Sequence, residues 1–185
     1  MTRLPGLSLT HLASPLGPLR AAAMDTAVVL LEFADTPRAD VQLQRLCTRL
    51  GVDAVERRSP VLEQLSDELA AYFAGNRQAF DVPLHHPGTA LQCASWSALR
   101  EIPYGKTRSY AQHATALGHA RAVRAIGTCN GLNRIAILVP CHRLVTRQGT
   151  LGGYGGGLWR KQWLLDFEAG LRPGVRHHRP AARHR

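Results

Sequence analysis

Short apolar runs separated by turn residues dominate the first part of the chain. The runs at residues 7–13, 19–24 and 27–33 have the length of strands, and Pro15-Leu16-Gly17 and Asp25-Thr26 stand between them. We therefore expect a small antiparallel sheet at the start of the chain.

Two stretches with helical periodicity follow the predicted sheet. Thr36-Pro37 and Ser59-Pro60 each place a hydroxyl side chain at the cap and a proline at the first helical position. Apolar residues, among them Val41, then recur at helical spacing, and Gly51 and Gly75 are typical end points. The pattern predicts two capped helices that cover the sheet.

Residues 76–88 have no periodicity and contain His85-His86-Pro87-Gly88, a composition typical of a linker. The two histidines have no neighbouring cysteine or acidic residue to complete a metal site, so we expect a solvated loop and no metal. The linker divides the chain into an N-terminal α/β lobe, a second domain and a disordered basic tail, at residues 1–84, 85–170 and 171–185.

The second domain is predicted to be mostly helical. Ser109 can cap a short helix at residues 110–117, and a second short helix at residues 120–130 carries Arg121 and Arg124. Two short helices joined by a glycine-containing turn are typical of a helix-turn-helix, although any packed pair can resemble one.

Longer helices are expected on either side of this pair, at residues 89–102 and 158–168. Glu168 falls at the C-terminal end of the last helix, where a carboxylate opposes the helix dipole. It is therefore either a solvated surface charge or a group held there for a reason.

The net charge of +10 is confined to one half of the chain. Residues 1–81 hold eight Arg and ten acidic residues, whereas residues 82–185 hold fifteen Lys or Arg and three acidic residues. A one-sided cationic excess is expected of a protein that binds a phosphate backbone. A solubility bias in an arginine-rich proteome is the alternative, but the first half shows no excess, so we favour nucleic acid.

Pro140-Cys141-His142-Arg143 follows an apolar run at residues 135–139, which we expect to be a buried strand. A free cysteine usually packs as a small hydrophobe, whereas a thiolate is a strong nucleophile. The cationic neighbours His142 and Arg143 are expected to lower the pKa of the thiol, and an apolar core has no need of them. The neighbours favour chemistry at Cys141, with a structural thiol as the alternative.

Other patterns exclude several classes of protein. The glycine run at residues 152–157 lacks the spacing of a nucleotide-binding loop. The four cysteines are scattered, and the chain has neither a signal-peptide pattern nor an apolar run long enough to span a membrane. We expect a cytoplasmic monomer with reduced thiols and no membrane partner.

A set of motifs stands in fixed order along the second half: Ile102-Pro103-Tyr104-Gly105, Ser109-Tyr110, Ala122-Val123-Arg124-Ala125-Ile126-Gly127, Asn133, Ile137-Leu138-Val139-Pro140-Cys141-His142-Arg143, Gly153-Tyr154, Gly156-Gly157 and Trp163-Leu164-Leu165. With these motifs, residues 87–168 resemble the O6-alkylguanine-DNA alkyltransferases, also called methylated-DNA–protein-cysteine methyltransferases. The N-terminal lobe resembles the family more loosely.

The resemblance implies an α+β fold, with a ribonuclease H-like N-terminal lobe and a mostly helical C-terminal domain whose helix-turn-helix is of the winged-helix type. It implies DNA repair by irreversible transfer of an alkyl group from O6-alkylguanine in double-stranded DNA to Cys141, once per molecule and without a cofactor. O4-methylthymine is a further candidate substrate. The damaged base has to be flipped out of the duplex, because a stacked base cannot reach a buried thiol.

The family's catalytic roles carry over to five positions. By the resemblance, His142 takes the proton of Cys141 through a water molecule, and Glu168 holds that histidine. Tyr110 assists the departing guanine with a proton or hydrogen bond, and Asn133 ties the active-site strand to the helix-turn-helix.

The resemblance also assigns DNA and substrate contacts. Arg124 stands where the family's arginine finger fills the vacated base stack, from a helix placed in the minor groove. The other DNA-contact positions are Ser109, Arg121, Ala125 and Gly127. The substrate pocket is assigned to Ala136, Leu144, Tyr154 and Gly155. Departures from the usual pattern, which bear on DNA contact and substrate range, occur at Leu91, Cys129, Asn130 and Ala136.

Three alternative functions remain. A relative that binds alkylguanine without repairing it would lack the cysteine that this chain has at position 141. A Cys-His hydrolase would turn over an ester or amide repeatedly, whereas an alkyl acceptor reacts once. A damage-responsive transcriptional activator would need a further sensor domain.

Overall fold

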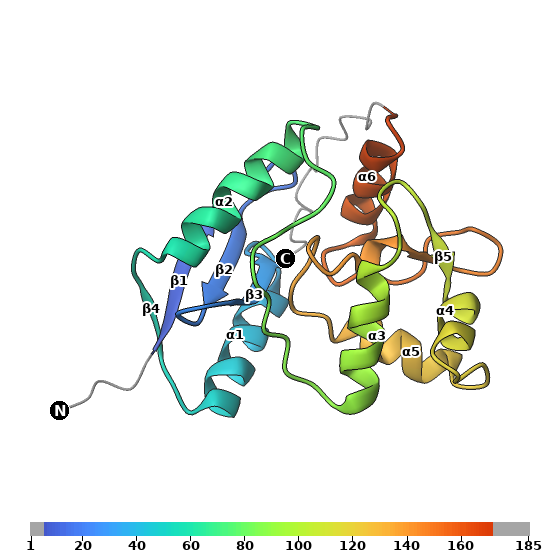
Figure 1. Ribbon diagram of the computed structural model, residues 1–185, viewed down its shortest axis with the longest axis horizontal. Helices are drawn as coiled ribbons and strands as arrows, with labels where there is room; N and C mark the ends of the chain where they lie inside the picture. Colours follow the sequence, from blue (N-terminus) through green and yellow to red (C-terminus); the bar gives the residue numbers. More distant parts are fainter. Residues whose placement is uncertain (1–5, 172–185) are drawn as a thin grey trace, which may run out of the picture.

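A computed structural model describes residues 6–171, which form two lobes packed side by side (Figure 1). The N-terminal lobe contains β1 (Leu7–Leu12), β2 (Leu19–Ala23), β3 (Val28–Phe33), α1 (Pro37–Leu50), β4 (Ala54–Glu56) and α2 (Pro60–Phe73). The C-terminal lobe contains α3 (Ala90–Arg100), β5 (Arg108–Ser109), α4 (Tyr110–Ala116), α5 (Val123–Gly131), a 3₁₀ turn (Cys141–Arg143), β6 (Leu144–Val145) and α6 (Leu158–Glu168). The predicted basic tail lies, apart from Leu171, outside the described residues.

The three predicted strands form the sheet in the expected antiparallel arrangement, with β2 between β1 and β3. A fourth strand, β4, extends the sheet and runs parallel to β1, so the sheet is mixed rather than wholly antiparallel. The sequence prediction missed β4 because a strand of three residues is too short to show an alternating pattern.

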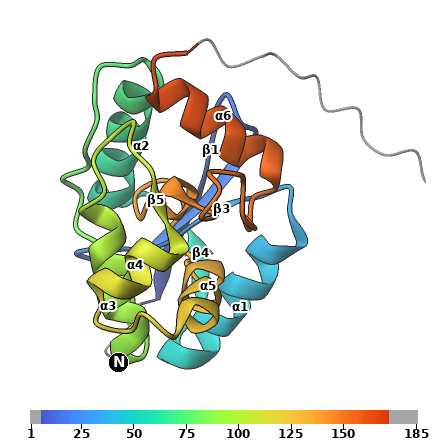
Figure 2. The same ribbon diagram turned by 90° about the vertical axis from the view of Figure 1, so that its right-hand side faces the viewer.

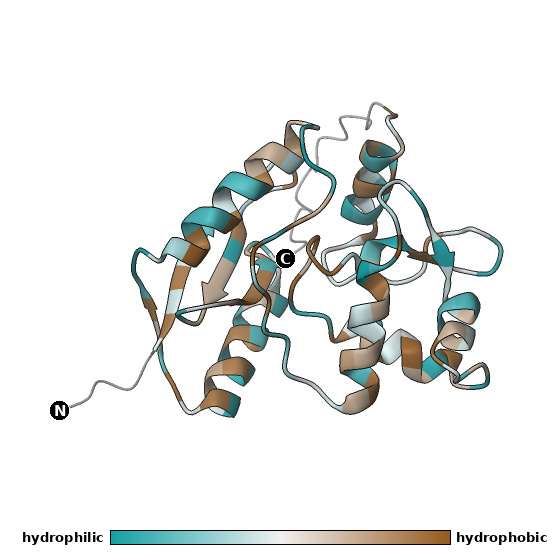
Figure 3. Ribbon diagram, viewed as in Figure 1, coloured by the Kyte–Doolittle hydropathy of each residue, from teal (hydrophilic) through white to brown (hydrophobic). Residues whose placement is uncertain are grey.

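Helices α1 and α2 pack on the sheet, and the alternation of strand side chains supplies two separate cores. Ala21 and Ala23 belong to a large cluster with α2, whereas Ala22 belongs to a smaller cluster with Leu46 of α1. The strands are accordingly coloured mostly as hydrophobic in Figure 3. The large cluster continues into Leu164 and other residues of the C-terminal lobe, so the two lobes share one core.

Two details of the predicted helices were wrong. Val41 is 44% exposed, because α1 faces the sheet through Ala39, Gln42 and Leu46. Since Gln42 is polar, the pattern of apolar residues in the sequence does not reveal this buried face. Thr36 and Ser59 occupy the cap positions, but neither side chain accepts a capping hydrogen bond. The helices begin there because proline suits the first turn, not because of the hydroxyl groups.

The C-terminal lobe contains the predicted helix-turn-helix, formed by α4 and α5 (Figure 2). Ser109 begins α4 with a reciprocal capping box that involves Gln112, as the sequence suggested. Helix α5 starts at Val123 rather than at residue 120, so Arg121 lies in the turn before the helix, and that part of the prediction was wrong. No helix within residues 6–171 is long and apolar enough to cross a membrane.

The segment before the cysteine is not a strand. Only Ile135 pairs with the sheet, through a single parallel bridge to Leu31 of β3. Beyond it the chain turns sharply at Ile137, whose φ of 70° is unusual for a β-branched residue. The amide of Leu138 donates to the carbonyl of Ala136 at 2.8 Å across that turn. A strained turn therefore ends the apolar run and places Cys141.

Arg160 of α6 fastens the two lobes together. Its guanidinium donates to the carbonyls of Leu16 (2.8 Å) and Gly156 (2.9 Å) and to the carboxylate of Asp35 (2.6 Å). The group lies 4.3 Å from the ring centroid of Phe33 and is almost completely buried. Because Gly156 belongs to the glycine run, this contact also ties that run to the N-terminal lobe.

We predict that Arg160→Met lowers the free energy of unfolding by about 3 kcal/mol, because two buried carbonyl groups lose their donor. The matched control is Arg58→Met, since the Arg58 side chain is 94% exposed in its pair with Glu63 and should change stability by less than about 0.5 kcal/mol. Urea denaturation measures both, and equal effects would contradict the fastening role.

Candidate active site

Cys141 lies at the base of an open cavity of about 730 Å³ between the glycine run and the helix-turn-helix. Cys141 is the first residue of the 3₁₀ turn and is buried, with only 6% of its surface exposed. The cavity brings Cys141 together with five of the predicted residues: Tyr110, Arg124, Gly127, Tyr154 and Gly155. A slightly larger hollow, about 800 Å³, lies on the N-terminal lobe and is lined by none of the predicted site residues.

The other predicted residues lie around this cavity rather than on its wall. Leu144 and Ala136 are buried, and neither is among the described residues that line it. Ser109 lies at the start of α4, Ala125 is exposed on α5, and Arg121 is exposed in the preceding turn. The predicted contacts of these five residues with DNA or substrate stay predictions.

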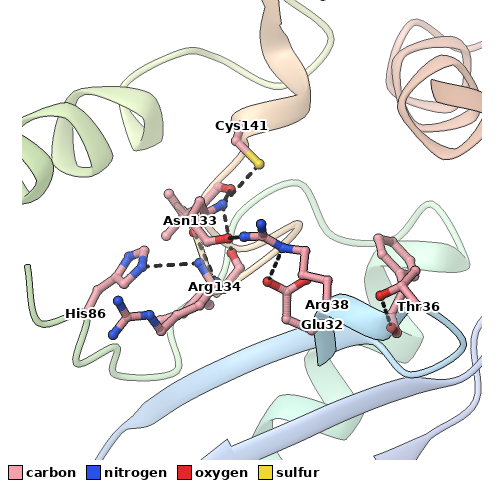
Figure 4. Close-up of polar contacts among 10 residues, drawn as sticks. Glu32, Thr36, Arg38, His86, Asn133, Arg134 and Cys141 are labelled. Atoms are coloured by element: carbon pink, nitrogen blue, oxygen red, sulfur yellow. Dashed lines mark hydrogen bonds and ion pairs between the residues drawn. The ribbon is translucent and has the colours of Figure 1, made fainter. Parts of the chain in front are cut away.

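Asn133 holds the cysteine and the strained turn in place. Its amide nitrogen donates to the thiol of Cys141 at 3.0 Å and to the carbonyl of Val139 at 2.9 Å, and its amide oxygen accepts from the backbone of Ile135 at 3.0 Å. Figure 4 shows the side chain between the thiol and the N-terminal lobe. One residue thus positions the nucleophile and closes the loop that precedes it.

The expected lowering of the cysteine's pKa was wrong. Burial raises the pKa of Cys141 to about 11, although the hydrogen bond from Asn133 and the charge of Lys161 act in the opposite direction. Arg143, expected to act on the thiol, points instead at Glu168. The resting thiol is therefore protonated at neutral pH, and it becomes a nucleophile only after a base takes its proton.

His142 is arranged to act as that base. Its Nε2 lies 2.9 Å from Oε1 of Glu168, and an ionised carboxylate only accepts, so Nε2 carries the proton. The other ring nitrogen, Nδ1, is buried and has no hydrogen-bond partner within residues 6–171. Burial lowers the pKa of His142, which favours the neutral ring despite the carboxylate. A neutral imidazole with a free nitrogen can accept a proton.

Glu168 is a buried charge with a full set of donors. Besides His142 it accepts two hydrogen bonds from Arg143, at 2.8 and 3.0 Å, one from the hydroxyl of Tyr72 at 2.8 Å and one from the amide of Gly105 at 3.3 Å. Burial alone would raise the pKa of Glu168, but His142 and Arg143 hold it well below its usual range. Of the two readings of Glu168, the solvated surface charge is therefore excluded: the carboxylate is buried at the end of α6 and held there by its hydrogen-bond donors.

Two residues that sequence reasoning missed complete the site. Arg38 of α1 donates to the backbone carbonyl of Asn133 at 2.6 Å and to Glu32 at 2.9 Å, and so links the N-terminal lobe to the residue that holds the thiol (Figure 4). Lys161 is fully buried and donates to the carbonyl of Gly152 at 3.2 Å. No local pattern distinguishes these from ordinary helical cations.

The site contains no metal cluster. No group of three or more His, Cys, Asp or Glu side chains within residues 6–171 is arranged to hold an ion. His86, one of the two linker histidines, is stacked on Trp96 with ring centroids 3.6 Å apart, and its Nε2 accepts from the backbone of Arg134. It packs against the C-terminal lobe and is not the solvated loop residue that was expected.

Glu168→Gln should lower the free energy of unfolding by about 3 kcal/mol at pH 7, because Arg143 would be left buried without a counter-charge. The pKa of Glu168 is lower in the folded than in the unfolded chain, so its contribution is complete above about pH 5 and is lost as the pH falls below about 4. Urea denaturation across this range tests both points. Glu63→Gln, in the exposed pair with Arg58, is the control and should show little change at either pH.

The fold and the site together define a helix-turn-helix protein whose buried cysteine, with its own base, faces an open cavity. Residues 90–170 match the family described as 6-O-methylguanine DNA methyltransferase, DNA binding domain, and residues 8–86 match its ribonuclease-like domain. The chain therefore belongs to the 6-O-methylguanine DNA methyltransferase family.

Individual relatives agree over most of the chain. A methylated-DNA–protein-cysteine methyltransferase of Salmonella typhimurium is 41% identical over 165 residues, which cover 86% of this chain and 94% of the relative. A relative of the same name from Mycobacterium tuberculosis is 51% identical over 107 residues, which cover 58% of this chain and 65% of the relative. The structure is similar to that of Mycobacterium tuberculosis OGT in complex with DNA, with a TM-score of 0.77 and 38% identity over 90% of this chain and 96% of that one.

Proposed function

We propose that this protein repairs DNA by transferring an alkyl group from the O6 atom of guanine to Cys141, once per molecule. The observation that carries the proposal is the hydrogen-bonded thiol at the base of a cavity, next to a histidine whose free nitrogen is backed by a buried carboxylate. Membership of the family and the relatives' shared name support the same reaction.

The reaction is a displacement at the alkyl carbon. The proton of the Cys141 thiol passes to Nδ1 of His142 through a water molecule, and Glu168 stabilises the resulting imidazolium. The thiolate attacks the alkyl carbon, a carbon–sulfur bond forms and the carbon–oxygen bond breaks, and the electron pair stays with the guanine. Tyr110 gives a proton to the departing base. The products are a thioether and normal guanine, and the thioether is too poor a leaving group for the cysteine to be regenerated.

Double-stranded DNA is the partner that the surface around the cavity suits. Arg124 of α5 and Arg147 line the cavity and are exposed, so they can meet phosphates or enter a groove while a flipped base occupies the cavity. Arg124 fills the place of the extruded base in this proposal. Ser109, Arg121, Ala125 and Gly127 extend the contact along the helix-turn-helix.

We assign residues 1–84 to a supporting lobe and residues 85–170 to DNA binding and alkyl transfer. A monomer is sufficient, because every proposed catalytic residue comes from one chain. We assign the protein to the cytoplasm, since an alkyl acceptor needs a reduced thiol and all four cysteines are free.

The direct test mixes the protein with duplex DNA containing O6-methylguanine and measures the intact protein mass. We expect one methyl group per molecule, on Cys141. Cys141→Ala should gain none, whereas Cys93→Ala, at an exposed cysteine, should react as the wild type does. Tight binding to the lesion with unchanged mass would support the recognition-only alternative, and repeated turnover of an ester would support the hydrolase.

Arg124→Ala should slow repair of duplex DNA by about 10-fold or more while leaving the reaction with free O6-benzylguanine near normal, because a free base does not have to be flipped. Single-turnover rates with the two substrates give the comparison. Equal losses on both substrates would show that Arg124 acts on the pocket itself rather than on the duplex.

A further inference from the structure

Asn130 is a buried polar residue on the cavity wall to which the reaction proposed above gives no role. It belongs to α5, is only 5% exposed and lines the cavity with Cys141 and Tyr110. Its amide nitrogen lies 3.4 Å from the hydroxyl of Tyr110 and 3.5 Å from the carbonyl oxygen of Cys141. Its amide oxygen is buried and has no hydrogen-bond partner in the part of the chain that the structure describes.

The carbonyl of Cys141 fixes which way this amide points. A carbonyl oxygen only accepts hydrogen bonds, so the amide nitrogen of Asn130 must face it. The reversed amide would instead bring two acceptor oxygen atoms within 3.5 Å of each other, with no proton between them. The same nitrogen therefore also faces Tyr110.

This orientation determines what the hydroxyl of Tyr110 can do. The phenol has one proton and accepts from the amide of Asn130, so its own proton has to point elsewhere. Within residues 6–171 its one acceptor is the carbonyl of Gly153, at a long 3.5 Å. A ligand in the cavity can take the proton in place of this weak contact.

The ring of Tyr110 has little freedom to turn away. A side chain at Gly152 would lie 2.6 Å from the ring, so the glycine run packs directly against it, and the ammonium group of Lys161 lies 5.8 Å from the ring centroid. Burial raises the pKa of Tyr110, and so does Cys141 when its thiol is ionised, while the contact from Asn130 opposes that rise. The phenol thus keeps its proton at neutral pH.

We propose that Asn130 is a positioning residue for alkyl transfer: held by the carbonyl of Cys141, its amide directs the hydroxyl proton of Tyr110 toward the departing base. The proposal rests on the proposed function and deepens it. As the carbon–oxygen bond breaks, the Tyr110 proton passes to the guanine, and the amide donates to the phenolate oxygen left behind until the proton taken up by His142 reaches it through water.

The main test replaces Asn130 with leucine, which keeps a similar volume and removes the donor. Asn130→Leu should slow methyl transfer from O6-methylguanine duplex DNA by about 3- to 10-fold, a part of what a general acid contributes. The control is Asn76→Leu, at an exposed position whose side chain makes no contact with the site, and it should react at the wild-type rate.

Two further measurements separate this role from a structural one. In a Tyr110→Phe background, Asn130→Leu should cause less than about a 2-fold further loss, because the hydroxyl on which it acts is absent. Alkylation of Cys141 by iodoacetamide, followed by mass mapping, should proceed at nearly the wild-type rate in Asn130→Leu. Iodide leaves without a proton, so that reaction needs the thiol and not the acid.

Equal slowing in the presence and absence of the Tyr110 hydroxyl would overturn the proposal, and so would an equal fall in the iodoacetamide rate, which would place the effect on the thiol. No slowing at all in Asn130→Leu would overturn it as well. These outcomes are distinct from failure of the proposed function, in which wild-type protein would gain no methyl group from the lesion.

Discussion

The carboxylate of Glu168 is the group on which the rest of the structure depends. It is buried at the end of α6 and joins Tyr72 of the N-terminal lobe, the turn at Gly105 and the two residues that follow the cysteine. An ionised carboxylate in an apolar interior is tolerated only when its oxygens are fully hydrogen-bonded. That requirement brings four distant segments together and places the imidazole of His142 with its second nitrogen free.

The thiol is reactive on demand rather than permanently. Burial raises the pKa of Cys141 to about 11 and so favours the protonated thiol, and in the proposed reaction the neutral His142 beside it supplies the base. A protonated resting thiol suits the proposed single alkyl transfer, because a permanently ionised thiolate would react with any soft electrophile that entered the cavity. Tyr110, the proposed acid, likewise retains its proton at rest. Its hydroxyl makes only a long contact with the carbonyl of Gly153, which a departing guanine can replace in the proposed reaction.

The N-terminal lobe contributes no nucleophile, yet it shapes the site. The edge of β3 holds Ile135 just before the strained turn at Ile137, and Arg38 holds the backbone of Asn133. Such strain persists only where the surroundings leave the chain no alternative. The N-terminal lobe therefore fixes the backbone on which the turn before Cys141 is built. Arg160 also holds the glycine run next to this lobe.

Much of this could be predicted from the sequence, because the signals that define elements are local. Strand alternation, the capping box at Ser109 and the glycine after α1 lie within a few residues of what they control. The motif around Cys141 likewise pointed to the cysteine and histidine that we propose as nucleophile and base, although its apolar lead-in suggested a strand where the backbone makes a strained turn.

The sequence by itself determined most of the elements, the charged half of the chain and the residues to which we assign the chemistry. Only the tertiary structure decided their electrostatics, because these depend on contacts between residues about 95 positions apart, such as Arg38 with Asn133 and Tyr72 with Glu168. Arg143 pairs with Glu168 and not with the thiol, and burial raises the pKa of Cys141. Burial and long-range pairing are properties of packing, and no pattern of neighbouring residues records them.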